Sequence, residues 1–127
     1  MNKQILKDRI LAECDEDDVG LWVIIWELEN QGVQNRHLKE ETLTFIELLM
    51  NDGLISAGHV RVVEQENRAV FDHWNLTPSE TVARISKEWD KLGRLPTIGD
   101  IVYFTITDKG MEYLRTIAND TPNSESV

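Results

Sequence analysis

Apolar residues recur every three or four positions through the first half of the chain, which is the spacing of one face of an α-helix. This pattern predicts three helices, over about residues 2–13, 19–30 and 37–51. The second of them is apolar on nearly every side, so we expect it to be a central core helix or one half of an interface. Its two tryptophans, Trp22 and Trp26, are predicted to lie in the core.

Beyond Gly53, which is placed to cap the third helix at its C-terminus, the apolar pattern changes to one typical of β-strands. Strands are predicted over residues 54–57, 59–63 and 101–106. The alternation of β-branched and aromatic residues is strongest in the last of these. The chain is therefore expected to combine helices with a small sheet, which is the α+β class.

Two helix starts can be recognised in the second half. The sequence Thr77-Pro78-Ser79-Glu80 is a capping box with proline at the first helical position, and it predicts a helix that ends at Leu92 and Gly93. A last helix is predicted to begin at residues 107–108. We expect a single domain over residues 1–118 and a disordered tail over 119–127, because the tail is small and polar.

Two segments resemble parts of the winged-helix transcription regulators. Residues 48–55, with the sequence LLMNDGLI, are similar to the end of the recognition helix and the first wing strand of that family. Residues 103–114, with the sequence YFTITDKGMEYL, are similar to the second wing strand and the closing helix. The resemblance implies a winged-helix-like domain with a small antiparallel sheet, in which the helix that begins at Thr77 is an insertion. Residues 74–104 also resemble a recurrent element of small uncharacterised bacterial proteins, a resemblance that implies a bacterial origin and gives no information about activity.

Three features separate the chain from a DNA-binding winged helix. The presumed recognition helix carries more acidic than basic residues, although phosphates would have to approach it. Only residues 31–36 separate it from the preceding helix, which leaves no room for another short helix between them. About 45 residues lie between the two wing motifs, where an ordinary wing is a short hairpin.

The charge of the chain favours a protein partner over nucleic acid. Lys and Arg number 13 and Asp and Glu number 23, so the net charge is −10, which repels a phosphate backbone. We expect a non-enzymatic acidic interaction module that binds a basic partner, as an immunity protein or an antitoxin binds its toxin. The alternative is a winged-helix DNA-binding regulator, and a homodimer is left open. The chain has no apolar run near the roughly 18 residues of a membrane span and no signal-peptide pattern, so the cytoplasm is the expected compartment.

Five residues are predicted to contact the basic partner. The acidic run is placed where the second helix would begin, so its carboxylates are also expected to cap that helix. The polar neighbours of Trp74 predict an exposed loop edge. The predicted contact residues are Asp15, Glu16, Asp17, Asp18 and Trp74. In the alternative, a basic stripe of the inserted helix would contact nucleic acid or an acidic partner through Arg84, Lys87, Lys91 and Arg94.

Residues for catalysis or metal binding are not predicted. Cys14 falls on the apolar face of the first helix, where a small buried thiol is the usual explanation. The histidines His37, His59 and His73 are isolated from it and from one another, unlike the clustered ligands of a zinc site. The acidic run lacks the glycine turn and the oxygen spacing of a calcium loop. We therefore expect no catalytic residue, no metal and no cofactor.

Overall fold

The computed structural model of the protein describes residues 2–120 and combines helices with an antiparallel sheet, which confirms the α+β class. In chain order the elements are α1 (Lys3–Glu16), β1 (Val19–Gly20), α2 (Leu21–Asn30), α3 (Asn35–Asn51), β2 (Ile55–Val63), a 3-10 turn (Glu64–Glu66), β3 (Arg68–His73), α4 (Pro78–Leu92), β4 (Tyr103–Ile106) and α5 (Asp108–Asp120). Residues 121–127, most of the predicted tail, lie outside the described part.

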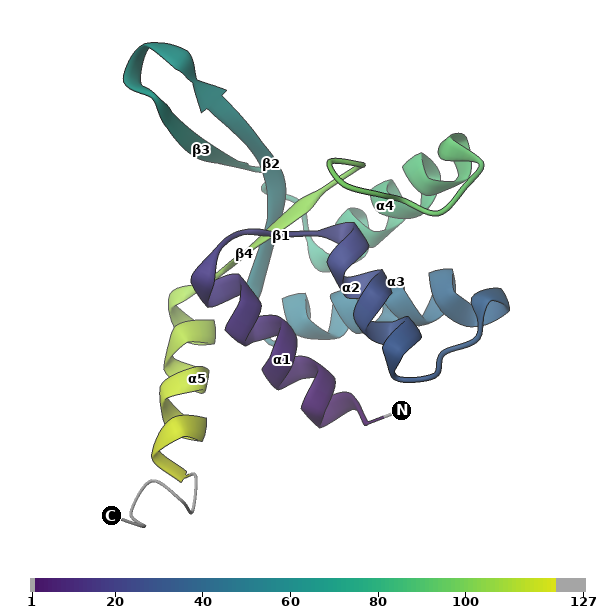
Figure 1. Ribbon diagram of the computed structural model, residues 1–127, viewed down its shortest axis with the longest axis horizontal. Coiled ribbons are helices and arrows are strands. Elements are labelled where there is room, and N and C mark those ends of the chain that lie inside the picture. Colours follow the sequence, from purple (N-terminus) through teal and green to yellow (C-terminus); the bar gives the residue numbers. More distant parts are fainter. Residues whose placement is uncertain (1, 121–127) are drawn as a thin grey trace.

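The sheet has the strand order β1-β4-β2-β3, and every pair is antiparallel. Strand β2 changes partner at Gly58, because residues 55–58 pair with β4 and residues 58–63 pair with β3. A side chain at Gly58 would collide with the main chain of Asp72 on β3. The outer half of β2 and the whole of β3 therefore form a hairpin that extends away from the helices (Figure 1).

The predicted start of α4 and the predicted end of α3 are confirmed. At the start of α4, Glu80 donates its main-chain N–H to Thr77 Oγ1 over 3.1 Å, and Thr77 donates its N–H to Glu80 Oε1 over 2.9 Å. At the end of α3, Gly53 adopts a φ of 73° and the N–H of Leu54 reaches back to the carbonyl of Leu49. This is a Schellman end, which requires a residue without a Cβ penalty in the left-handed region.

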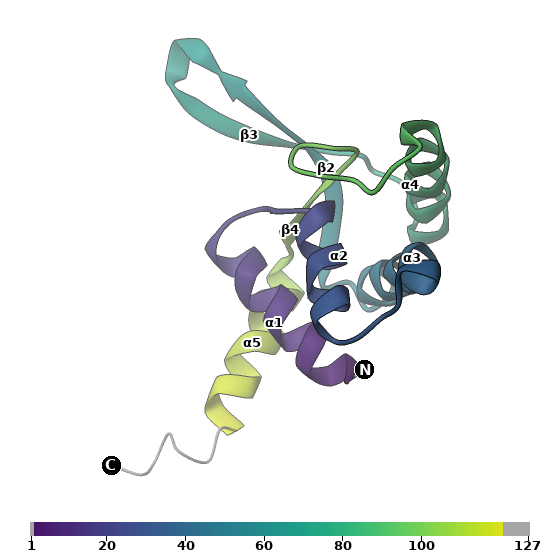
Figure 2. The same cartoon turned by 45° about the vertical axis from the view of Figure 1, so that its right-hand side comes forward.

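The core lies where α1, α2 and α3 meet the inner half of the sheet. Helices α1 and α3 bury the stripes that their periodicity predicts, and the α4 face carrying Ile85 and Trp89 is buried as expected. Helix α4 packs against α3 and crosses it (Figure 2). The largest fully buried side chains are Leu6, Ile10, Leu11, Leu21, Ile24, Leu28, Leu38, Phe45, Ile46, Leu49, Ile85 and Phe104.

Three details differ from the pattern-based predictions. Val19 and Gly20 form a short strand against β4 and precede α2, although they were expected to be helical. Strand β3 was not predicted, because its alternation is broken by charged residues on an exposed hairpin. Trp26 is 53% exposed and not part of the core, because α1 and α3 cover the opposite side of α2.

A bilayer-spanning helix is not found among residues 2–120, since each helix there is too short or too polar.

Candidate functional site

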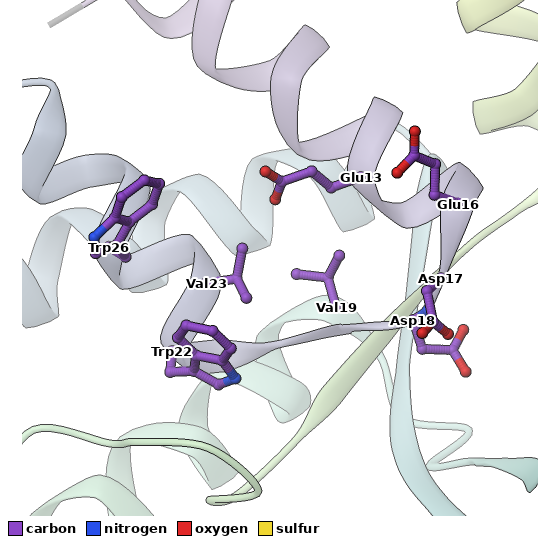
Figure 3. Close-up of a pocket in the computed structure, with 8 residues that line it drawn as sticks. All are labelled: Glu13, Glu16, Asp17, Asp18, Val19, Trp22, Val23 and Trp26. Atoms are coloured by element: carbon purple, nitrogen blue, oxygen red, sulfur yellow. The ribbon is translucent and has the colours of Figure 1, made fainter.

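A groove of about 440 Å³ lies between the end of α1 and the first turns of α2 (Figure 3). Its floor is apolar and its rim is acidic. The apolar residues all follow the acidic run in the sequence, while the carboxylates come from the last turn of α1 and the link to β1. The lining residues are Glu13, Glu16, Asp17, Asp18, Val19, Trp22, Val23 and Trp26.

The acidic run ends α1 and does not begin α2, so the expected capping role is wrong. The N-cap of α2 is Gly20, which has no side chain that could cap the helix, while Asp17 is the C-cap of α1. Tertiary structure causes this difference: Val19 and Gly20 pair with β4 as strand β1, which separates the acidic run from α2. Local sequence carries no sign of that pairing.

Because the acidic run lies at the C-terminus of α1, the groove has an excess of negative charge. The C-terminus of a helix carries a partial negative charge, and acidic side chains there add to the negative potential. Each such interaction with the helix dipole changes the free energy by about 0.3 to 1 kcal/mol at low ionic strength. Helix α1 has no basic residue in its last turn, and no Lys or Arg is among the groove-lining residues of the described chain. The groove therefore favours the approach of a cation.

Glu13 connects the groove with the helix interface behind it. Its Oε2 atom is buried and has no hydrogen-bond partner within the described chain. Burial raises the pKa of the Glu13 carboxyl, and the nearby carboxylate of Glu27 raises that pKa further. Glu27 is itself only 2% exposed, and its one ion pair, to Arg9, is long at 3.5 Å. The α1–α2 interface thus holds two carboxylates against a single exposed guanidinium.

Replacing Glu13 by glutamine is expected to stabilise the protein at pH 7. A carboxyl whose pKa is raised by folding costs stability once the pH rises above that pKa, and the amide cannot ionise. The gain in the free energy of unfolding should be about 0.2 to 1 kcal/mol, which is the contribution of a solvent-screened ion pair. Thermal unfolding at pH 7 and near pH 4 measures it, because the raised pKa of Glu13 favours its protonated form at the lower pH, so the gain should shrink there.

Glu16→Gln is the matched control, since Glu16 is exposed on the same turn of the same helix. It should change the melting temperature less than Glu13→Gln at pH 7. A lower melting temperature for Glu13→Gln at pH 7, or an equal gain at both pH values, would show that Glu13 is not held in an unfavourable ionised state.

The structure brings together three of the five predicted contact residues. Glu16, Asp17 and Asp18 line the groove, whereas exposed Asp15 does not. Trp74 lies elsewhere, in the loop after β3 as predicted, but it is partly buried against the core instead of exposed. Its indole N–H donates to His59 Nδ1 over 3.0 Å, and the guanidinium of Arg84 stacks 3.8 Å from its ring centre. Trp74 thus joins the hairpin to α4.

The predicted basic stripe is divided by ion pairs. Arg84 donates to Glu88 over 2.8 Å, and Arg94 donates to Asp100 over 2.8 Å. Lys87 and Lys91 are exposed on α4 and have no ion pair among the described residues. The stripe therefore presents two unpaired cations where the sequence suggested four.

Cys14 is buried on α1, as predicted, and burial raises the pKa of its thiol to about 12. The nearby carboxylates of Asp18 and Glu13 add to the rise. A thiol in this environment stays protonated at neutral pH, unlike a reactive cysteine. Within residues 2–120, no three His, Cys, Asp or Glu side chains are grouped so that they could hold a metal ion.

Two lining residues of the groove, Trp22 and Trp26, were expected in the core, with an interface as the alternative. Trp22 and Trp26 were assigned to the core because α2 is apolar all round, so periodicity could not distinguish its faces. Their spacing of four was the available signal, since it places both on one stripe of the helix, directly after an acidic run.

A comparison of the chain with protein-family models, with curated proteins and with solved structures found no match.

Proposed function

We propose that the protein is a non-enzymatic interaction module that binds a basic protein through the groove between α1 and α2. The observation that carries this proposal is the combination of an apolar floor with four carboxylates and, among the described residues that line the groove, no Lys or Arg. Immunity proteins and antitoxins, which neutralise basic toxins, are the class of function that fits this chemistry best.

The groove offers a cation two kinds of contact. A Lys or Arg side chain can place its charge against Asp17 and Asp18, where it relieves the repulsion between carboxylates. Its aliphatic stem can pack on the tryptophan rings, and a cation over an aromatic face adds about 0.5 to 2 kcal/mol. The net charge of −10 also steers a basic partner towards the protein before contact.

The order of elements supports a winged-helix-like scaffold for this module. Helices α1, α2 and α3 precede β2, and β2 pairs with β4, the strand that the resemblance assigns to the second side of the wing. The hairpin β2–β3 extends beyond this pair (Figure 1). Helix α2 has ten residues and can itself serve as the short helix before the recognition helix. In this interpretation α4 is the inserted helix, and the turn between α2 and α3 needs no additional element.

A DNA-binding regulator remains the second candidate because of the same wing, but the charges oppose it. On the hairpin, Arg61 pairs with Asp72 and Arg68 pairs with Glu66. Helix α4 packs against α3 (Figure 2). Lys39 of α3 forms an ion pair with Asp90 of α4 over 2.6 Å. These pairs leave little positive charge for phosphates on the surfaces that a winged helix would use.

One equilibrium experiment separates the two functions. We expect a fluorescently labelled peptide of lysine and serine to bind the protein at low salt, and a labelled random DNA duplex not to bind at about 150 mM salt. Even non-specific DNA binding should be weaker than the usual range of about 10⁻⁴ to 10⁻⁶ M. Fluorescence anisotropy measures both.

The control is a charge-matched variant. In the groove variant, Glu16, Asp17 and Asp18 are changed to lysine. In the control variant, lysine replaces Glu40, Asp52 and Glu64, three exposed residues away from the groove, so both variants have the same net charge. The groove variant should lose much more affinity for the peptide than the control variant. Equal losses would mean that only the total charge matters, and micromolar DNA binding would favour the regulator.

A further inference from the structure

Trp22 and Trp26 form a ridge, which we call the tryptophan ridge, with the acidic groove on one side. A second hollow lies on the other side of this ridge. It has a volume of about 290 Å³ and shares Trp22 and Trp26 with the acidic groove. Its far wall is the segment between α4 and β4. The other lining residues are Ile25, Glu29, Leu95, Pro96, Thr97 and Ile98. One carboxylate is present here, against four in the groove, so the two flanks of the ridge differ in chemistry.

The segment that forms the far wall is held in place by Asp100. The carboxylate of Asp100 accepts hydrogen bonds from Arg94 Nη1 over 2.8 Å and from the main-chain N–H of Thr97 over 2.8 Å. A third bond comes from the hydroxyl of Thr97. These donors lower the pKa of the Asp100 carboxyl, so the bonds persist well below neutral pH. The loop is thus fixed before any partner arrives.

This fixed loop exposes large apolar side chains. Ile98 is 74% exposed and Leu95 is 38% exposed, while Pro96 between them is buried. Together with Trp26 across the hollow, they form an apolar surface that we call the Trp26–Ile98 patch, made of Trp26, Leu95 and Ile98. Exposed apolar groups gathered around one hollow are typical of an interaction surface, and presenting them on a rigid loop lowers the entropy cost of binding.

We propose that the partner segment is an amphipathic basic helix that lies across the tryptophan ridge. Its cationic side chains enter the acidic groove, and its apolar side chains pack on the Trp26–Ile98 patch. An amphipathic helix presents these two chemistries on adjacent faces, as the two flanks of the ridge require. This inference rests on the proposed function and adds that a basic charge alone is not sufficient for tight binding.

A second copy of the chain fits the ridge poorly. Each copy carries a net charge of −10, and the carboxylates of the groove would face another acidic surface. Charge complementarity therefore favours a basic partner of a different sequence.

Three labelled peptides of about 14 residues, roughly four helical turns, test the proposal. The first carries lysine on one face and leucine on the adjacent face. The second has serine in place of leucine, and the third has glutamine in place of lysine. Each is titrated by anisotropy against the wild-type protein and against a Leu95→Ser, Ile98→Ser variant. Neither substituted side chain belongs to the buried core, so the variant should fold, and circular dichroism checks this.

The first peptide should bind the wild-type protein at least about ten-fold more tightly than either of the others, because only it uses both flanks. The double variant should lose this advantage and still bind the serine peptide as the wild-type protein does. If the leucine and serine peptides bind equally and the double variant changes nothing, the amphipathic partner is wrong while the proposed function stands.

Other outcomes separate the remaining possibilities. If neither lysine peptide binds, the proposed function itself fails. Sedimentation velocity of the protein alone is the complementary measurement. If the chain dimerises and the double variant is monomeric, the Trp26–Ile98 patch is an interface between copies, and the proposal for an amphipathic partner is overturned.

Discussion

Replacing Ile46 by alanine is expected to lower the free energy of unfolding by about 3 kcal/mol. Ile46 is fully buried on α3, and truncating a buried isoleucine removes its transfer free energy and leaves a cavity. Chemical denaturation followed by circular dichroism measures the effect. We expect Ile46→Val to cost about 0.5 to 1.5 kcal/mol, since most of the side chain remains.

Trp26→Ala is the matched comparison, because a larger side chain is removed from a half-exposed site. It should cost no more than about 1 kcal/mol, as is usual for surface positions. A loss near 3 kcal/mol for Trp26→Ala would mean that Trp26 belongs to the core, and the tryptophan ridge would then be unavailable to a partner.

Reversing Glu16, Asp17 and Asp18 to lysine is expected to slow association with the lysine–leucine peptide by about ten-fold or more at low salt. Charges around a binding site act mainly on the association rate, and their effect decreases as salt shortens the Debye length. Lysine at the C-terminus of α1 interacts favourably with the helix dipole, so the variant should remain folded. Stopped-flow measurements at two salt concentrations test both the size and the salt dependence.

The control variant with lysine at Glu40, Asp52 and Glu64 has the same net charge. It should associate at a rate much closer to that of the wild-type protein, because those carboxylates lie outside the groove. If the two variants slow association equally, steering depends on total charge, and the groove has no special part in it.

Much of the fold could be predicted from the sequence where local signals decide the structure. The capping box at Thr77 and the Schellman end at Gly53 depend on chemistry within a few residues, and both are confirmed. The apolar stripe of α3 depends only on helical spacing, and it is buried as expected. Strand β1 was missed because its pairing partner, β4, lies more than 80 residues away in the chain.

The candidate site was predicted only in part, for a related reason. The acidic run could be recognised as a charged surface, but whether it begins or ends a helix depends on the insertion of β1. Trp22 and Trp26 could not be assigned to a face, because α2 is apolar all round and its neighbours decide which side is covered. Ile98 carries no sequence signal at all, since its exposure depends on the loop that Asp100 holds.

The indole N–H signals of the four tryptophans test the central claim most directly, in a ¹H–¹⁵N spectrum of the full chain titrated with the lysine–leucine peptide. Tryptophan-to-phenylalanine variants assign the signals. We expect the indole signals of Trp22 and Trp26 to shift as the peptide saturates the protein. The signals of buried Trp89 and of Trp74, whose indole N–H is hydrogen-bonded to His59, should not shift. Unchanged signals from Trp22 and Trp26, or shifts confined to Trp74 and Trp89, would contradict the central claim.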